Sequence, residues 1–539
     1  MSMLLAISPV LVIFLLMTWA RRSADVAGAI GWVWTVLLAA FWFRTSWTVI
    51  LVASLAGIVA SFPISLMVVT SIFQINVMEE AGAIRRLVVF MKTLASENRS
   101  AQVMLINVGI GTILAALGAT PVSILPPIML SLGYSAFVSI ALPAIGYDAL
   151  CTYALLGVPV VVFADVAKGI TGHEYAPAEV GAYFAQYMPV ITSLIALSML
   201  WLVGGRSELR RGWPAAVVTG LTAGFIAIGM NVGGLPTLTG VVAGAGVVLA
   251  MLAYLRLGGH RVIDRGRLGG DDLRIESGMT LGLAVLPWIL LVLFSVATNF
   301  GKIGIYDVTF NRIAMPVEIV PGRPEKLRML WQAYTWVLAA TLVAIPFYRM
   351  NRARLGAAWR KTLRRAPRPA FAAAIYFAIA FVLNHSGKTP TAGPGGRALW
   401  AMSPGGGLNM VKVVADGCAG VFHQAYAGVA AFLGLLGGFI SGSETSSIVM
   451  LSKLHFDTMA QVFAGADPEK LLRISILVAA VSGIGGGLAS VISPAKLQNA
   501  AAVIDQIGME SRVIRATVVI ALLMTLVAAL MTFVFLAFA

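Results

Sequence analysis

Three ionisable side chains lie within apolar stretches of the sequence, where charge is rare: Lys496, Asp148 and Glu444. An ionisable group inside a lipid bilayer is costly, so it usually marks a place where charge is bound or moved. Lys496 could pair with an anion or with Asp148, or it could extend its ammonium group to the membrane surface. Asp148 could take up a proton, since burial disfavours a carboxylate, or it could form a purely structural ion pair. Glu444 could also take up a proton, or it could only stabilise the start of a helix.

Glycine, proline and hydroxyl residues interrupt the apolar stretches at four places, 118–123, 156–159, 441–447 and 491–494. A helix that breaks inside a membrane leaves backbone N–H groups unpaired, and a polar partner must meet them. Thr-Pro and Ser-Pro pairs within two of these breaks are typical of helix starts. Helix starts carry partial positive charge and free donors, so several of them together would bind a carboxylate and a neighbouring hydroxyl. The candidate binding residues are Thr120, Ser123, Tyr147, Thr152, Ser441, Ser443, Thr445, Ser446, Ser493 and Lys496, and the candidates for proton coupling are Asp148 and Glu444.

The elements that must position these residues are apolar helices. Of 539 residues, 59% are hydrophobic and 11% are charged, against about a quarter charged in an average soluble domain. Apolar runs recur along the whole chain, and each is about long enough to cross the roughly 30 Å hydrocarbon core of a bilayer. The runs are continuous rather than alternating, which favours helices over barrel strands. We therefore predict an all-α polytopic membrane protein with roughly 12 transmembrane helices and two re-entrant hairpins.

The net charge of +15 does not indicate nucleic-acid binding, because Lys and Arg gather in short segments between apolar runs. The three clearest basic segments, 206–211, 256–274 and 349–368, are expected to be loops that face the cytoplasm. The first apolar run, 3–20, has no basic residue before it and no cleavage pattern after it, so we expect a retained span. The cysteines and histidines lack ligand spacing, so the sequence predicts neither a metal site nor a cofactor.

The two ends of the chain are predicted to contain the same arrangement, a hairpin followed by a broken span, in opposite membrane orientations. If the three basic segments are cytoplasmic, the first hairpin has both ends inside and the second has both ends outside. Inverted repeats with interrupted helices are typical of transporter sites at mid-membrane, although glycine and proline can also merely kink a membrane helix. The expected parts are a first repeat at 1–205 with a hairpin at about 101–134 and a broken span at about 137–164, a linking region at 206–368, and a second repeat at 369–539 with a hairpin at about 418–455 and a broken span at about 473–505.

The motifs at these breaks resemble those of the bacterial lactate permease family, which includes lactate and glycolate permeases. The strongest likeness is FISGSETSS at 439–447, followed by VISP at 491–494, PVSI at 121–124, LGY at 132–134 and LGVP at 156–159. The resemblance covers nearly the whole chain. It implies a protein of the bacterial inner membrane, surrounded by lipid, that takes up a 2-hydroxymonocarboxylate with a proton. It also implies an elevator-type fold, in which a transport domain slides against a scaffold that can dimerise.

The sequence departs from the family's pattern at three places. Residues 113–118 lack the acidic residue that the family has in a Gly-rich run, Tyr147-Asp148 stands where an Asn-Thr pair is usual, and Lys496 stands where the family is polar and uncharged. These differences leave open a sodium-coupled or uncoupled carrier of another organic anion, such as a sulfonate or a longer hydroxy acid. In that alternative Lys496 would hold the extra charge.

A membrane-embedded enzyme and a channel fit the sequence less well. An enzyme acting on lipid-linked substrates would be expected to place acidic, His or Arg clusters in long loops near the membrane surface. The long segment 384–407 contains no carboxylate. A channel would need rings of charge along a pore. The sequence therefore predicts a carrier of a small organic anion that performs no covalent chemistry.

Overall fold

Apolar helices form most of the molecule. The computed structural model describes residues 2–538 except 21, 96, 118–119, 300–304, 394–397 and 405. Within these described ranges, nine helical segments are long and apolar enough to cross a membrane, which supports the prediction of a polytopic membrane protein. They are Ala24–Trp42, Phe62–Ala81, Arg99–Ala116, Cys151–Lys168, Met188–Val232, Pro236–Leu257, Arg352–His385, Pro468–Ala502 and Glu510–Leu536.

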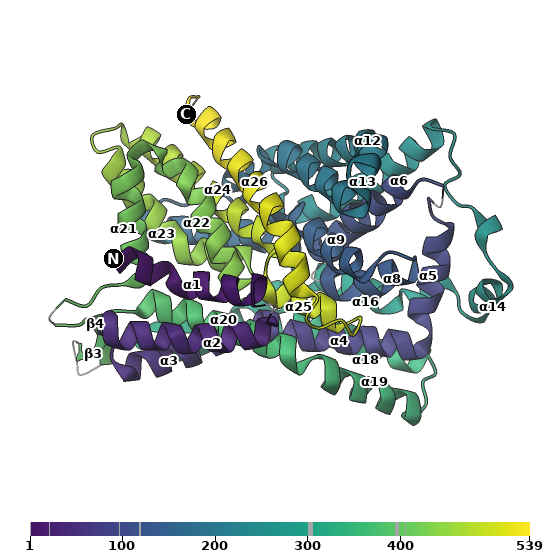
Figure 1. Ribbon diagram of the computed structural model, residues 1–539, viewed down its shortest axis with the longest axis horizontal. Helices are drawn as coiled ribbons and strands as arrows, with labels where there is room; N and C mark the ends of the chain where they lie inside the picture. Colours follow the sequence, from purple (N-terminus) through teal and green to yellow (C-terminus); the bar gives the residue numbers. More distant parts are fainter. Residues whose placement is uncertain are drawn as a thin grey trace.

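The N-terminal helices and several helices from the middle of the chain form a row along one side of the molecule (Figure 1). Their bounds are α1 Ser2–Thr18, α2 Ala24–Leu37, α3 Trp47–Ala60, α4 Phe62–Ala81, α16 Leu286–Asn299, α18 Ala333–Phe347, α19 Arg352–Arg365 and α20 Pro367–His385. α5, Ala83–Thr93, stands upright at one end of this row (Figure 1). α2 and α3 pack along α20, whereas α4 packs along α18 and α19. The row thus joins segments that lie far apart in the sequence.

The first half of the chain contains a helical hairpin followed by an interrupted helix. The helices are α6 Arg99–Val103, α7 Gly111–Ala116, α8 Pro121–Ser131, α9 Ala136–Asp148, α10 Ala154–Thr171 and α11 Pro177–Ala185, with a π-helical segment at Met104–Ile110 and a 3-10 turn at Cys151–Tyr153. α8 begins at Pro121, directly after Thr120, as the Thr-Pro pair predicts. Two residues of the expected break, 118 and 119, lie outside the described residues.

The second half repeats this order of elements. The helices are α21 Met410–Phe422, α22 Tyr426–Ser441, α23 Glu444–Val462, α24 Pro468–Leu488, α25 Pro494–Ala502 and α26 Glu510–Leu536, with 3-10 turns at His423–Ala425 and Ala489–Val491. α22 begins at Tyr426, directly after the turn at His423–Ala425 that separates it from α21. The chain reverses between α22 and α23 at Gly442, which has φ +66°.

Glycines bring α22 and α24 into backbone contact. A Cβ atom added at Gly434 would meet the carbonyl oxygen of Ser482, and one added at Gly438 would meet that of Gly486. Small residues at such positions let membrane helices approach closely, since packing rather than hydrophobic transfer drives their association. The second hairpin is therefore held tightly against the first arm of the interrupted helix.

Gly434→Ala is expected to destabilise the protein by about 1–3 kcal/mol, because the added methyl group meets backbone that cannot rotate away. Thermal unfolding of the purified protein in detergent measures this effect. Gly229→Ala in α12 is the matched control, because a Cβ there meets nothing within 4 Å. Equal melting temperatures for the two variants would contradict the close approach of α22 and α24.

The structure differs from the sequence-based description in two ways, one in the linking region and one after it. Its remaining elements are α12 Met188–Val232, α13 Thr239–Leu257, α14 Gly270–Gly278, α15 Leu281–Ala284, α17 Ile305–Asp307, and the strands β1 Met315–Val320 and β2 Arg323–Leu327. Residues 206–211, expected as a loop, are helical and belong to α12. The segment after α20 also carries an antiparallel strand pair, β3 Lys388–Ala392 and β4 Ala398–Met402, which apolar periodicity does not reveal.

Candidate functional site

The two interrupted helices face each other at their breaks. α9 ends at Asp148 and is followed by the turn at Cys151–Tyr153, while α24 ends at Leu488 and is followed by the turn at Ala489–Val491. α9 contacts this second turn, and α24 contacts the first. α9 and α25 lie near the centre of the molecule, between the hairpin of α22 and α23 and the pair α12 and α13 (Figure 1).

Lys496 on α25 reaches across this junction. Its Nζ donates a hydrogen bond of 2.6 Å to Ser490 Oγ and lies 3.9 Å from the centroid of the Tyr147 ring. A cation over an aromatic face is stabilised electrostatically. Lys496 forms no direct ion pair with a carboxylate of the described residues, so a hydroxyl and a π face are its close partners. These two contacts hold the ammonium group in place, and no carboxylate of the described residues pairs directly with its charge.

Asp148 lies buried beside Lys496, with a relative exposure of 6%. Its carboxylate faces the Ser490 hydroxyl and the Val491 N–H of the opposite repeat, and it lies within electrostatic reach of Lys496. Its Oδ1 has no hydrogen-bond partner among the described residues. A buried polar atom without a partner is uncommon and calls for an explanation such as a bound water, ion or ligand.

Glu444 links the second hairpin to the break in the first repeat. Thr152 Oγ1 donates a hydrogen bond of 2.6 Å to Glu444 Oε1, and the Cys151 thiol lies beside the same carboxylate. Thr152 and Glu444 are both buried. This short hydrogen bond ties the start of α23 to a residue almost three hundred positions away in the sequence.

The first hairpin reaches the same region through α8. Ser123 Oγ accepts a hydrogen bond of 2.8 Å from Asn499 Nδ2 of α25 and shares one of 3.0 Å with Ser71 Oγ of α4. Thr120 directly precedes α8, and its side chain makes no capping hydrogen bond. Asn499 lies one turn after Lys496 on α25, so this short helix touches both the first hairpin and the junction.

The hydroxyl residues at the tip of the second hairpin have mostly local partners. Ser443 Oγ accepts the Ser446 N–H at 3.2 Å and caps α23, while Ser441 Oγ donates to Gly437 O at 2.8 Å. The side chains of Thr445 and Ser446 are partly exposed.

Ser493, directly before α25, lies beside this hairpin tip. It is buried and its Oγ has no hydrogen-bond partner among the described residues. A Cβ atom added at Gly442, where the hairpin reverses, would come within 3.1 Å of the same oxygen. The helix starts at Ser443 and Ser493 therefore lie next to each other.

Strained backbone marks the break in the first repeat. Leu155 and Leu156 have φ of +54° and +55°, and Gly157 has φ of +75°. Residues other than glycine rarely adopt positive φ, and such strain is common at functional sites. The break therefore extends from the end of α9 to Gly157, which is longer than the predicted 156–159 and begins earlier.

The structure brings together five of the predicted residues, Tyr147, Asp148, Thr152, Glu444 and Lys496. Ser123 and Ser493 contact neighbouring parts of α25 and the hairpin tip. The remaining predicted residues lie at helix starts and the hairpin tip, where their side chains form no hydrogen bond with Lys496 or Asp148. They are Thr120, Ser441, Ser443, Thr445 and Ser446.

Sequence reasoning missed Ser490, Asn499 and Ser71. Ser490 supplies the closest partner of Lys496, and Asn499 connects α25 to Ser123. A usable signal was the sequence KLQN at 496–499, a run of polar residues in an apolar stretch. No local signal pairs Ser71 with Ser123, since that contact depends on how α4 packs against α8.

Known proteins match this chain over almost its full length. Residues 2–538 match the family model described as L-lactate permease. Glycolate permease GlcA of Escherichia coli (strain K12) is 24% identical, with 96% of this chain and 92% of that protein covered. An L-lactate permease of the same strain is 23% identical, with 99% and 95% covered. An L-lactate permease of Bacillus subtilis (strain 168) has the same identity and coverage.

Proposed function

Because the chain belongs to the L-lactate permease family, we propose that it is a secondary transporter of a small 2-hydroxymonocarboxylate such as lactate or glycolate. The transported anion would cross the bacterial inner membrane together with a proton. Relatives named for L-lactate and for glycolate support a substrate of this class. The observation that carries the proposal is the position of Lys496, at the junction of two helix breaks and near two buried carboxylates.

The charges at the junction support coupling to a proton. Lys496 is positive, whereas Asp148 and Glu444 are negative when ionised, and a buried site tolerates little net charge. An empty site is neutral when one of the two carboxyl groups is protonated. Once a monoanion binds to Lys496, the site is neutral only when both carboxyl groups are protonated. Binding of one anion would therefore draw in one proton.

The helix starts and hydroxyls around Lys496 suit the rest of such a substrate. The Ser493 Oγ has no hydrogen-bond partner among the described residues. Together with the N–H groups that Ser443 does not cap in the first turns of α23 and α25, it would provide donors for a carboxylate and its neighbouring hydroxyl. Because Asp148 and Glu444 are buried, a proton from either side of the membrane would reach them only after the surrounding elements move. We propose an elevator-type movement, in which the two hairpins and interrupted helices move together against the row of α2, α3, α4 and α20.

Uptake into proteoliposomes tests the proposal. Labelled lactate and glycolate are offered under an imposed inward proton gradient, with and without sodium. We expect uptake that depends on the proton gradient and not on sodium. Sodium-dependent uptake, or uptake of sulfonates or longer hydroxy acids without lactate or glycolate, would instead support the alternative carrier of another organic anion. No uptake of any of these anions would contradict the proposal.

Hydroxyls at the hairpin tip give a test of where the substrate binds. The Thr445 side chain makes no hydrogen bond to the described residues, so Thr445→Val should weaken substrate affinity about three- to tenfold and leave the melting temperature nearly unchanged. Ser443→Ala is the comparison for stability: it removes the cap of α23 as well as a hydroxyl and should lower stability by about 1 kcal/mol. Binding is measured by isothermal titration with lactate, and unchanged affinity in Thr445→Val would remove this residue from the site.

A further inference from the structure

The break inside α12 forms a pocket of about 1070 Å³ at the surface of the molecule. The residues that line it lie between 197 and 217 and include none of the candidate site. Gly204 has φ −156° and ψ 20°, and Gly205 has φ 60° and ψ −144°. The Gly205 conformation is essentially restricted to glycine. The turn folds the helix back so that residues before and after it line one pocket.

Three arginines, Arg206, Arg210 and Arg211, line this pocket. None of them forms an ion pair with a carboxylate of the described residues, although other arginines of the chain do, such as Arg365 with Asp505. Glu208 is the one acidic residue between 204 and 217. Its side chain packs against Gly204, and its carboxylate lies within electrostatic reach of Tyr134. It does not line the pocket. The pocket therefore presents positive charge that no carboxylate of the described residues pairs with.

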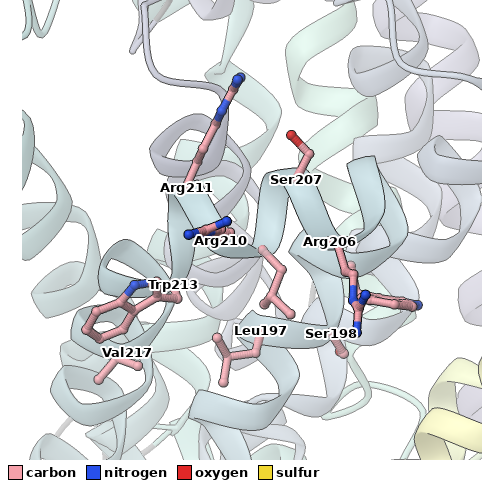
Figure 2. A pocket seen from close by; sticks show the side chains of 10 residues that line it. Leu197, Ser198, Arg206, Ser207, Arg210, Arg211, Trp213 and Val217 are labelled. Atoms are coloured by element: carbon pink, nitrogen blue, oxygen red, sulfur yellow. The ribbon is translucent and has the colours of Figure 1, made fainter.

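The pocket is also amphipathic along one direction. Figure 2 shows Leu197 and Val217 at one end, while Ser207 and Arg211 point away from them at the other, and Arg206 extends beside Ser198. Arg210 lies between these ends, and Trp213 flanks the apolar end. Trp201 and Trp213 are 49% and 54% exposed. Exposed tryptophans beside basic residues are typical of the boundary between lipid tails and head groups.

We propose that this pocket binds an anionic phospholipid. The arginine guanidinium groups can bind the phosphodiester through paired hydrogen bonds, and the acyl chains can lie along Leu197, Val217 and the tryptophan rings. Basic pockets between membrane helices suit anionic head groups for this reason. The apolar end favours a lipid over a free phosphate, because a free phosphate has no acyl chain to place there. The site is independent of the transported substrate.

Native mass spectrometry of the full-length protein in detergent tests the proposal. The protein is offered phosphatidylglycerol, phosphatidylcholine, glycerol phosphate or inorganic phosphate, and bound adducts are counted. The variant Arg206→Gln/Arg210→Gln/Arg211→Gln removes the charge, and the same three positions changed to Lys retain it. Arg352→Gln/Arg354→Gln/Arg360→Gln on α19 is the control for loss of three exposed arginines elsewhere.

The wild-type protein and the α19 variant are expected to retain phosphatidylglycerol in preference to phosphatidylcholine. The glutamine variant should bind phosphatidylglycerol roughly a hundredfold more weakly, because each basic residue near an anionic lipid strengthens binding about fivefold. The lysine variant should keep most of the binding, which shows that the fold tolerates change at these positions. Equal retention of the two lipids, an unaffected glutamine variant, or stronger binding of free phosphate than of lipid would each overturn the proposal.

Discussion

Lys496→Met is expected to abolish lactate uptake while the protein still reaches the membrane. The substitution removes the cation from a junction that contains Asp148 and Glu444 and leaves the volume of the side chain nearly unchanged. A bound monoanion would then face carboxyl groups with no opposite charge. Loss of one partner from a buried charge pair costs about 3 kcal/mol or more, so we expect at least roughly a hundredfold weaker binding.

Lys453→Met provides the control for this variant. Lys453 is exposed and pairs with Asp457 along the surface of α23, so the change removes one positive charge from outside the junction. Uptake of labelled lactate is compared at equal amounts of protein in the membrane. Wild-type uptake by Lys496→Met would show that Lys496 is a structural or surface-directed side chain and would contradict its role in binding.

The double variant Asp148→Asn/Glu444→Gln is expected to convert coupled transport into uncoupled anion movement. Both substitutions keep the shape of the side chain, and the new amide oxygen at position 444 can still accept the hydrogen bond from Thr152. Neither amide can take up a proton. One anion would then bind to Lys496 without a proton, so each transport step would carry one net negative charge.

Membrane potential distinguishes the two modes of transport. Under the proposed mechanism one proton and one anion move together in the wild-type protein without net charge, so a pH gradient should drive uptake and a potential should not. In the double variant an inside-positive potential of about 60 mV should favour accumulation about tenfold, and the pH gradient should have no effect. Exchange of internal for external lactate should persist. A double variant that still accumulates lactate in response to a pH gradient would contradict proton uptake at these carboxyl groups.

Local sequence signals were sufficient to locate the starts of α8 and α25 and the reversal between α22 and α23. Pro121 and Pro494 begin helices because proline is tolerated in the first turn and the preceding hydroxyl residue favours a non-helical conformation. Gly442 reverses the chain because glycine readily adopts positive φ. These effects involve only neighbouring residues, so they can be read from a short stretch of sequence.

Contacts between the two halves of the chain could not be predicted from neighbouring residues. The hydrogen bond from Thr152 to Glu444 joins residues from opposite halves of the chain, and it depends on the packing of several helices. The positive φ of Leu155 and Leu156 is also set by tertiary structure, because nothing in leucine itself favours it. The basic segment 206–211 is predicted as a loop, yet in the structure it continues as helix beyond the Gly204-Gly205 turn.

The family relationship and the junction chemistry together indicate where an anion should bind. A structure of the protein with bound lactate tests this most directly. We predict that the lactate carboxylate lies within hydrogen-bond distance of Lys496 Nζ, between Ser493 and the start of α23, with the ammonium group displaced from the Tyr147 ring. Lactate bound elsewhere, with Lys496 still over Tyr147 and bonded to Ser490, would contradict the account.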